Sequence, residues 1–126
     1  MARVTGIGGV FFKARDPKAL GAWYRDHLGL DVQEWGGAAL RWGTPENPGG
    51  TTAWSLFAGD TMHFAPSAAP FMVNYRVDDL VALLQSLRER GCNVLAGPER
   101  SEYGNFGWVL DPEGNKVELW EPPAGE

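Results

Sequence analysis

The sequence predicts an α+β fold in which two tandem βαβββ modules form a curved mixed sheet around a shared cleft. Two repeated signals carry this prediction. A helix start at an aspartate occurs twice, at Asp16 and Asp79, and a glycine that ends each helix follows at Gly29 and Gly91. One strand-like segment precedes each helix and three follow it, so the same plan repeats about once per half-chain.

The first module is expected to span about residues 6–57. Its opening strand is predicted at 7–14, a run of apolar and aromatic residues. Asp16 caps a helix whose first residue is Pro17, and apolar side chains then recur at helical spacing until Gly29. The three later strands are predicted at 31–34, 38–42 and 52–57.

The second module is expected to span about residues 71–122, after a linker at 58–70 that contains Gly59, Asp60, Pro66, Ser67 and Pro70. Its helix begins after Asp78 or Asp79 and ends at Gly91. Strands are predicted at 71–77, 93–96, 104–111 and 116–121. The two modules together make residues 1–126 a single domain, a size typical of one compact unit.

Composition excludes several functional classes. The 126 residues are 44% hydrophobic and carry a net charge of −5, and no two Lys or Arg residues are adjacent. The chain therefore lacks the basic stripe of a nucleic-acid binding protein. It also lacks the apolar run of about 18 residues that a membrane helix needs. A single cysteine cannot form an internal disulfide, which is typical of the cytoplasm, so we expect a soluble cytoplasmic protein.

The last hairpin directs one acidic side chain toward the cleft. Pro112 and Gly114 favour a turn, and the strand that follows alternates its side chains between the two faces of the sheet. Because Val117 and Leu119 are expected to pack under the helices, Glu118 should project from the opposite face.

Three segments of the sequence resemble the vicinal oxygen chelate superfamily, which contains glyoxalases, bleomycin-resistance proteins and extradiol dioxygenases. They are residues 14–30, which end in a Tyr-x-x-x-Leu-Gly pattern, residues 75–80, and residues 107–122 with their Asp-Pro-Glu-Gly-Asn turn. The resemblance extends from about Gly6 to Pro122 and implies the two-module fold. It also implies homodimerisation, because modules of this family often pair across chains to complete the cleft.

In metal-dependent members of the superfamily, the resemblance implies four ligand positions. They correspond here to Gly9, Met72, Glu118 and either Trp54 or Ser55. Glycine has no ligating side chain, and a thioether is a poor ligand for hard divalent ions. One carboxylate cannot hold a catalytic metal that requires three protein ligands. We therefore predict no metal and no other cofactor; His63 could add a ligand only if the linker folded back into the cleft.

The residues predicted to bind a small molecule share a position on the cleft face or in a neighbouring loop. They are Met72, Asn74, Arg76, Trp42, Trp54, Tyr103, Phe106 and Trp108. Aromatic-lined clefts with few polar groups are typical of small-molecule sites. Core packing is the alternative for the aromatic residues, and a backbone-satisfying amide is the alternative for Asn74.

Glu118 has two interpretations. It could act as a general acid or base, or it could form an internal salt bridge with Arg41, Arg76 or Lys13. The leading hypothesis is a metal-independent small-molecule binding protein that could sequester an aromatic or antibiotic-like ligand. The alternative is a lyase or isomerase of the glyoxalase-like family in which Glu118 transfers protons, and a partner-binding module is a third class.

Overall fold

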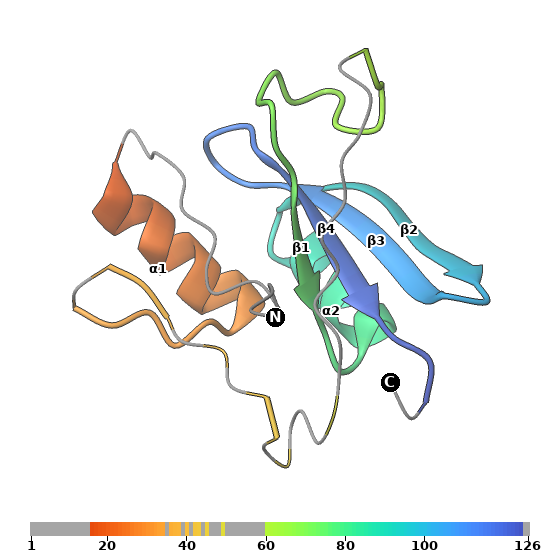
Figure 1. Ribbon diagram of the computed structural model, residues 1–126. Coiled ribbons are helices and arrows are strands. Elements are labelled where there is room, and N and C mark those ends of the chain that lie inside the picture. Colours follow the sequence, from red (N-terminus) through yellow and green to blue (C-terminus); the bar gives the residue numbers. More distant parts are fainter. Residues whose placement is uncertain are drawn as a thin grey trace, which may run out of the picture.

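The computed structural model describes residues 16–34, 36–38, 40, 42, 43, 45, 49 and 60–124. Within these residues the chain forms two helices and four strands (Figure 1). In chain order the elements are α1 (Pro17–Leu28), β1 (Val73–Arg76), α2 (Leu80–Glu89), β2 (Asn93–Ser101), β3 (Gly104–Leu110) and β4 (Lys116–Glu121).

The four strands form one mixed sheet in the order β1-β4-β3-β2. β1 runs parallel to β4, whereas β3 is antiparallel to both β4 and β2. The predicted βαβββ plan of the second module is therefore confirmed, because β1, α2 and the three later strands follow in that order. The strand predicted at 93–96 extends to Ser101, since two register shifts allow this edge strand to continue past Pro98.

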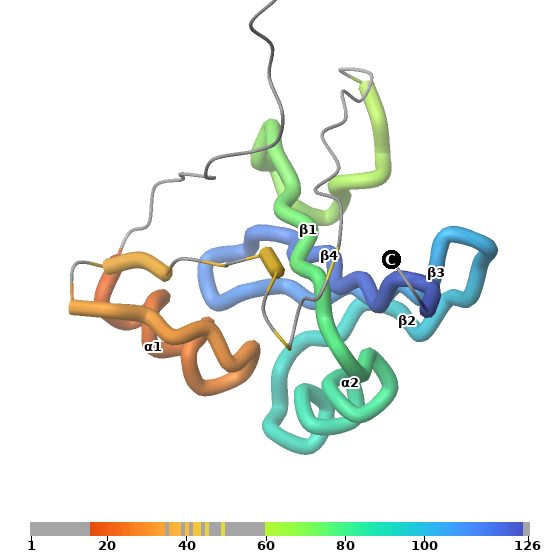
Figure 2. Tube along the Cα trace, turned by 60° about the horizontal axis from the view of Figure 1, so that its bottom comes forward, coloured from red at the N-terminus to blue at the C-terminus, as the bar shows by residue number. Residues whose placement is uncertain are grey.

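The core lies between α2 and one face of the sheet. Leu80, Leu84 and Leu87 of α2 are fully buried against apolar side chains of the central strands β3 and β4, which are Val109, Val117 and Leu119. Gly107 allows this close packing, because a Cβ there would lie 2.9 Å from Leu84 Cδ1. Figure 2 shows both helices on this side of the sheet and the segment before β1 on the other.

Both helices begin and end as the sequence predicts. The side chain of Asp16 accepts a hydrogen bond from the Ala19 backbone N–H, and Gly29 ends α1 in the left-handed conformation with a φ of 68°. Asp79, rather than Asp78, caps α2 through the Ala82 N–H, and Gly91 follows its last turn with a φ of 77°.

α1 is joined to the second module by Tyr24. The Tyr24 hydroxyl donates to Asp111 Oδ2 over 2.8 Å, and its ring lies 5.9 Å from that of Tyr75. Burial, more than the neighbouring Tyr75 and Asp111, raises the Tyr24 pKa above its usual range. Burial likewise raises the pKa of Tyr75 to about 12, so both hydroxyls stay protonated at neutral pH.

The strand predicted at 31–34 is wrong. The Gln33 backbone N–H donates to the Gly37 carbonyl and the Gly36 N–H donates to Gln33, which closes a turn instead. Three of the four side chains in this segment are exposed, so little apolar surface favours a strand. Of the segment 38–42, the described positions 38, 40 and 42 are not in a strand. The strands predicted at 7–14 and 52–57 lie outside the described residues, and the first module as a whole stays a prediction.

Candidate functional site

The face of the sheet opposite the core carries a cluster of polar and aromatic side chains. Strand register sets three of them side by side, because Glu118 of β4 lies opposite Asn74 of β1 on one side and Trp108 of β3 on the other. Glu118 projects away from the buried Val117 and Leu119, as the alternation predicts.

Three donors from different segments converge on the Glu118 carboxylate, whose side chain is only 13% exposed. Asn74 Nδ2 donates to Oε1 over 2.7 Å, and Trp108 Nε1 donates to Oε2 over 2.8 Å. His63 Nε2 lies 3.2 Å from the same Oε2. Because a carboxylate only accepts, this contact requires the proton of His63 on Nε2. The acidic group is therefore held in one orientation by three polar neighbours.

His63 brings the linker onto this face of the sheet. Its backbone carbonyl accepts a hydrogen bond from Lys116 Nζ over 2.5 Å, and its ring meets that of Trp108 edge-on at 6.1 Å. Figure 2 shows the segment around residues 60–70 on the side of the sheet away from α2. The condition that the sequence left open, that His63 reaches the cleft residues, is met.

An aromatic row runs beside Glu118 and consists of Phe106, Trp108 and Trp120. The Phe106 ring is nearly parallel to both tryptophan rings, at centroid distances of 6.3 Å to Trp108 and 6.4 Å to Trp120. These values lie at the upper end of the range of about 4.5–7 Å for directly interacting rings. Phe106 and Trp120 are half-buried, whereas Trp108 is only 9% exposed, so a flat ligand would meet mainly the rings of Phe106 and Trp120.

Trp120 is held by the β2–β3 turn. Its indole Nε1 donates to the Tyr103 carbonyl over 2.8 Å. A Cβ on Gly104 would lie 2.8 Å from that indole nitrogen and 2.4 Å from the Glu121 carbonyl oxygen, and Gly104 has a φ of +116°. The glycine therefore allows close approach between the turn and Trp120.

Two cations border the aromatic row. The Arg76 guanidinium carbon lies 5.5 Å from the Trp42 ring centroid and 5.9 Å from that of Trp120. Lys116 Nζ lies 5.6 Å from the centroid of Trp108. Cation–π attraction at these distances fixes the tryptophan rings. Neither cation bonds directly to Glu118. Of the three alternative partners for an internal salt bridge, Arg76 is therefore wrong. The other two, Arg41 and Lys13, lie outside the described residues.

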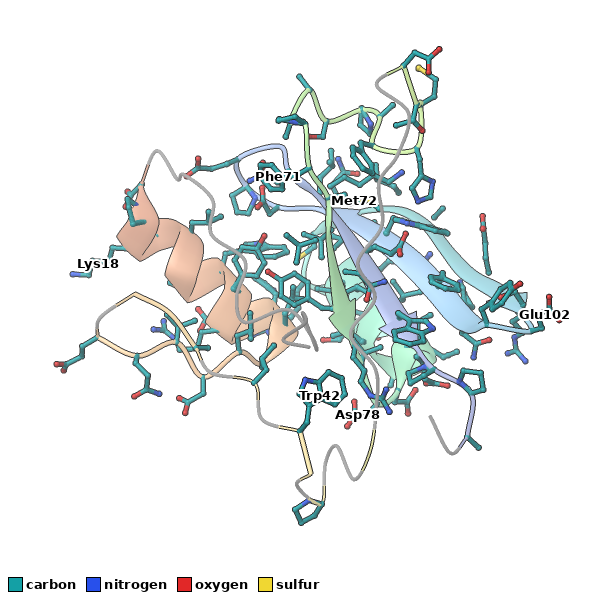
Figure 3. All side chains as sticks on the ribbon, in the orientation of Figure 1. Lys18, Trp42, Phe71, Met72, Asp78 and Glu102 are labelled. Carbon is teal, nitrogen blue, oxygen red and sulfur yellow. The ribbon has the colours of Figure 1, made fainter. Side chains whose placement is uncertain are left out.

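The other residues predicted to bind a ligand are spread more widely. Met72 is half-buried just before β1, and Trp42 lies by the opposite end of that strand (Figure 3). Tyr103 is 69% exposed, and only its carbonyl takes part in the cluster. Trp54 lies outside the described residues. Ligand contact by each of these residues stays a prediction.

Sequence reasoning left three members of this cluster out of the predicted site. His63 lies in a turn-rich linker without periodicity, so no pattern fixes its direction. Lys116 and Trp120 could have been found, because they stand two residues either side of Glu118 and must share its face.

A family model described as the glyoxalase/bleomycin resistance protein/dioxygenase superfamily matches residues 6–119 of the chain. The chain belongs to this superfamily. No curated protein matches it.

Solved structures with the same fold are distant in sequence. TnmS3, described as an antibiotic binding protein from Streptomyces sp. CB03234, is 20% identical, with a TM-score of 0.61 over 98% of this chain and 100% of that one. A protein of unknown function from Agrobacterium tumefaciens str. C58 is also 20% identical, with a TM-score of 0.55 over 93% and 98%.

A more similar sequence matches over a shorter length. A glyoxalase/bleomycin resistance protein from the same Streptomyces is 35% identical, with a TM-score of 0.37, but the match covers 39% of this chain and 42% of that one. The chain described here thus matches less than half of the length of this Streptomyces relative.

The metal that some members of the superfamily use does not fit the residues of this chain. His63 lies 3.2 Å from Glu118, so the two side chains could supply two ligands, one short of the three that a catalytic metal requires, and Asn74 and Trp108 already donate to the Glu118 oxygens. Of the other three implied positions, Met72 offers a thioether, and the sequence has glycine at 9 and no carboxylate at 54 or 55. The described residues contain no group of three or more His, Cys, Asp or Glu side chains that could hold a metal ion.

An open groove along α1 is a competing location for a ligand. It is lined by Trp23, Pro112 and Glu113 among others. Two of its carboxylates are engaged in local structure, because Asp16 caps α1 and Glu113 accepts from the Asp16 backbone N–H. The groove therefore has an aromatic side chain but no network comparable to that around Glu118.

No described helix is long and apolar enough to cross a membrane.

Proposed function

We propose that this chain is a metal-independent small-molecule binding protein whose ligand is aromatic or antibiotic-like and lies on the aromatic row beside Glu118. The observation that carries the proposal is the convergence of Asn74, His63 and Trp108 on one carboxylate. Side chains that order each other in this way present fixed polar groups before a ligand arrives, which reduces the entropic cost of binding.

The composition of the face supports a ligand of this kind. Small-molecule sites are mostly apolar and aromatic, with a few convergent polar groups that fix orientation. The aromatic row provides the apolar part, and Asn74, Lys116 and Glu118 provide the polar part. The distant similarity to TnmS3, whose description is an antibiotic binding protein, agrees with this proposal. Homodimerisation and a cytoplasmic location stay predictions.

The test is a screen of planar aromatic compounds by thermal shift, with protein first dialysed against a chelator. We expect at least one aromatic compound to raise the melting temperature, and to do so equally before and after chelation, because no metal takes part. Non-aromatic compounds of the same size serve as controls. Stabilisation that disappears after chelation and returns with a divalent cation would contradict the proposal.

A second candidate is proton-transfer catalysis by a lyase or isomerase. It is favoured by the 3.2 Å contact between His63 Nε2 and Glu118 Oε2, since a carboxylate can orient an imidazole that exchanges protons with a substrate. Under this alternative, replacing Glu118 by Gln abolishes turnover while the aromatic compound still binds. Under the leading proposal there is no turnover to lose.

A further inference from the structure

We infer that the ligand is an aromatic anion, such as an aryl carboxylate or an acidic phenol, and that Lys116 recognises its negative charge. The inference rests on the proposed function and specifies the ligand that the site takes. It follows from three properties of the face: its local charge, the donors left on Lys116, and the acceptor that Asn74 presents.

The local charge of this face is more positive than that of the whole protein. The chain has a net charge of −5, whereas the described charges around the aromatic row balance, with Arg76 and Lys116 against Glu118 and the exposed Glu99, which pairs with Phe106 across the strands. The Glu118 charge is also stabilised by hydrogen bonds from Asn74, Trp108 and His63. The net negative charge of the protein therefore does not extend to the end of the row at Lys116, where a negatively charged ligand meets a cation.

Lys116 is the cation best placed to contact such a ligand. It is half-buried, its ammonium lies 5.6 Å from the Trp108 ring centroid, and one of its three N–H groups is used by the His63 carbonyl. Within the segments that the structure describes, the other two N–H groups of the Lys116 ammonium have no hydrogen-bond acceptor. A carboxylate or phenolate oxygen on a ring that lies over the aromatic row can accept from them.

Asn74 adds an acceptor beside this cation. Because Glu118 can only accept, the amide nitrogen of Asn74 must face it, as the 2.7 Å contact shows. The amide oxygen must then point away from Glu118, on a residue that is exposed. A ligand N–H or O–H can donate to this oxygen. The face thus combines flat aromatic surfaces, one oriented acceptor and one cation.

A cationic aromatic ligand fits less well. It would benefit from the tryptophan faces and from Glu118, but its charge would lie near both Lys116 and Arg76, and Glu118 already has three hydrogen-bonding partners. The sign of the ligand charge is therefore a property that the site should discriminate.

The experiment compares three probes with one ring system: 2-naphthoate, neutral 2-naphthamide and cationic 2-naphthylmethylamine. Binding is followed by titration calorimetry at neutral pH. We expect 2-naphthoate to bind about tenfold more tightly than the amine, with the amide between them. In Lys116→Met the affinity for 2-naphthoate should fall about tenfold while that for the amide changes less than about twofold, and Lys116→Arg should retain most of the affinity.

Lys18→Met is the matched control, because Lys18 is an exposed cation on α1, away from the sheet (Figure 3). An equal loss of 2-naphthoate binding in both Met variants would overturn the inference, as would amine binding as tight as that of 2-naphthoate. The wild-type comparison decides the question even if Lys116→Met does not fold. Binding of all three probes with equal affinity rejects only the charge preference, whereas failure of every probe to bind also removes support from the proposed function.

Discussion

Replacing Asp111 by Ala is expected to lower the free energy of unfolding by about 3 kcal/mol, because it removes the acceptor of four hydrogen bonds at once. Asp111 is 5% exposed. Its Oδ1 accepts from the backbone N–H groups of Glu113 and Asn115, at 2.9 Å each. Its Oδ2 accepts from the Asn115 side chain over 3.0 Å and from the Tyr24 hydroxyl over 2.8 Å.

Asp111→Asn should cost about half as much, since an amide retains one acceptor oxygen for the two backbone donors. Urea denaturation monitored by tryptophan fluorescence measures both variants. Asp78→Ala is the control, because Asp78 is exposed and should change stability by less than about 0.5 kcal/mol. Equal effects of Asp78→Ala and Asp111→Ala would show that the turn does not join α1 to the sheet as described.

Replacing Glu118 by Gln is expected to weaken binding of an aromatic ligand about tenfold, with a loss of about 1–2 kcal/mol in the free energy of unfolding. Glutamine has the same shape but offers one acceptor oxygen to donors that come from Asn74, His63 and Trp108. At least one donor then faces an NH₂ group, so the fixed arrangement of the face is lost. Calorimetric titration and urea denaturation measure the two effects.

Glu102→Gln is the control for this change, because Glu102 is exposed at the β2–β3 turn (Figure 3). It removes the same charge without affecting the polar cluster. If Glu118→Gln binds the ligand as tightly as Glu102→Gln, the carboxylate does not organise the site, and the aromatic row alone accounts for binding.

Local signals predicted the second half of the fold well. Aspartate caps, closing glycines and apolar side chains at helical or alternating spacing are local in the sequence, and they located both helices and the strands from β1 to β4. The strand predicted at 93–96 was too short, because a proline such as Pro98 usually indicates the end of a strand. An edge strand with register shifts tolerates it. The segment 31–34 was predicted as a strand, but three of its four side chains are exposed, so little apolar surface is available to hold it in a sheet.

The candidate site was predicted only in part, for a similar reason. Alternation predicted the face from which Glu118 projects, because strand periodicity determines direction, whereas its neighbours Asn74 and Trp108 follow from the strand register of the structure. The partner His63 could not be predicted, since the path of the linker depends on tertiary contacts such as the Lys116 hydrogen bond. Sequence patterns therefore identify the face on which a side chain lies better than they identify its partner.

The most direct test of the site uses the indole N–H signals of ¹⁵N-labelled, chelator-treated protein in two-dimensional NMR. Trp108 and Trp120 lie in the aromatic row, whereas Trp23 lines the groove along α1. During titration with the aromatic compound that stabilises the protein most, the signals of Trp108 and Trp120 should shift while that of Trp23 stays in place. A shift of Trp23 alone, or shifts that occur only after a divalent cation is added, would contradict binding beside Glu118 without a metal.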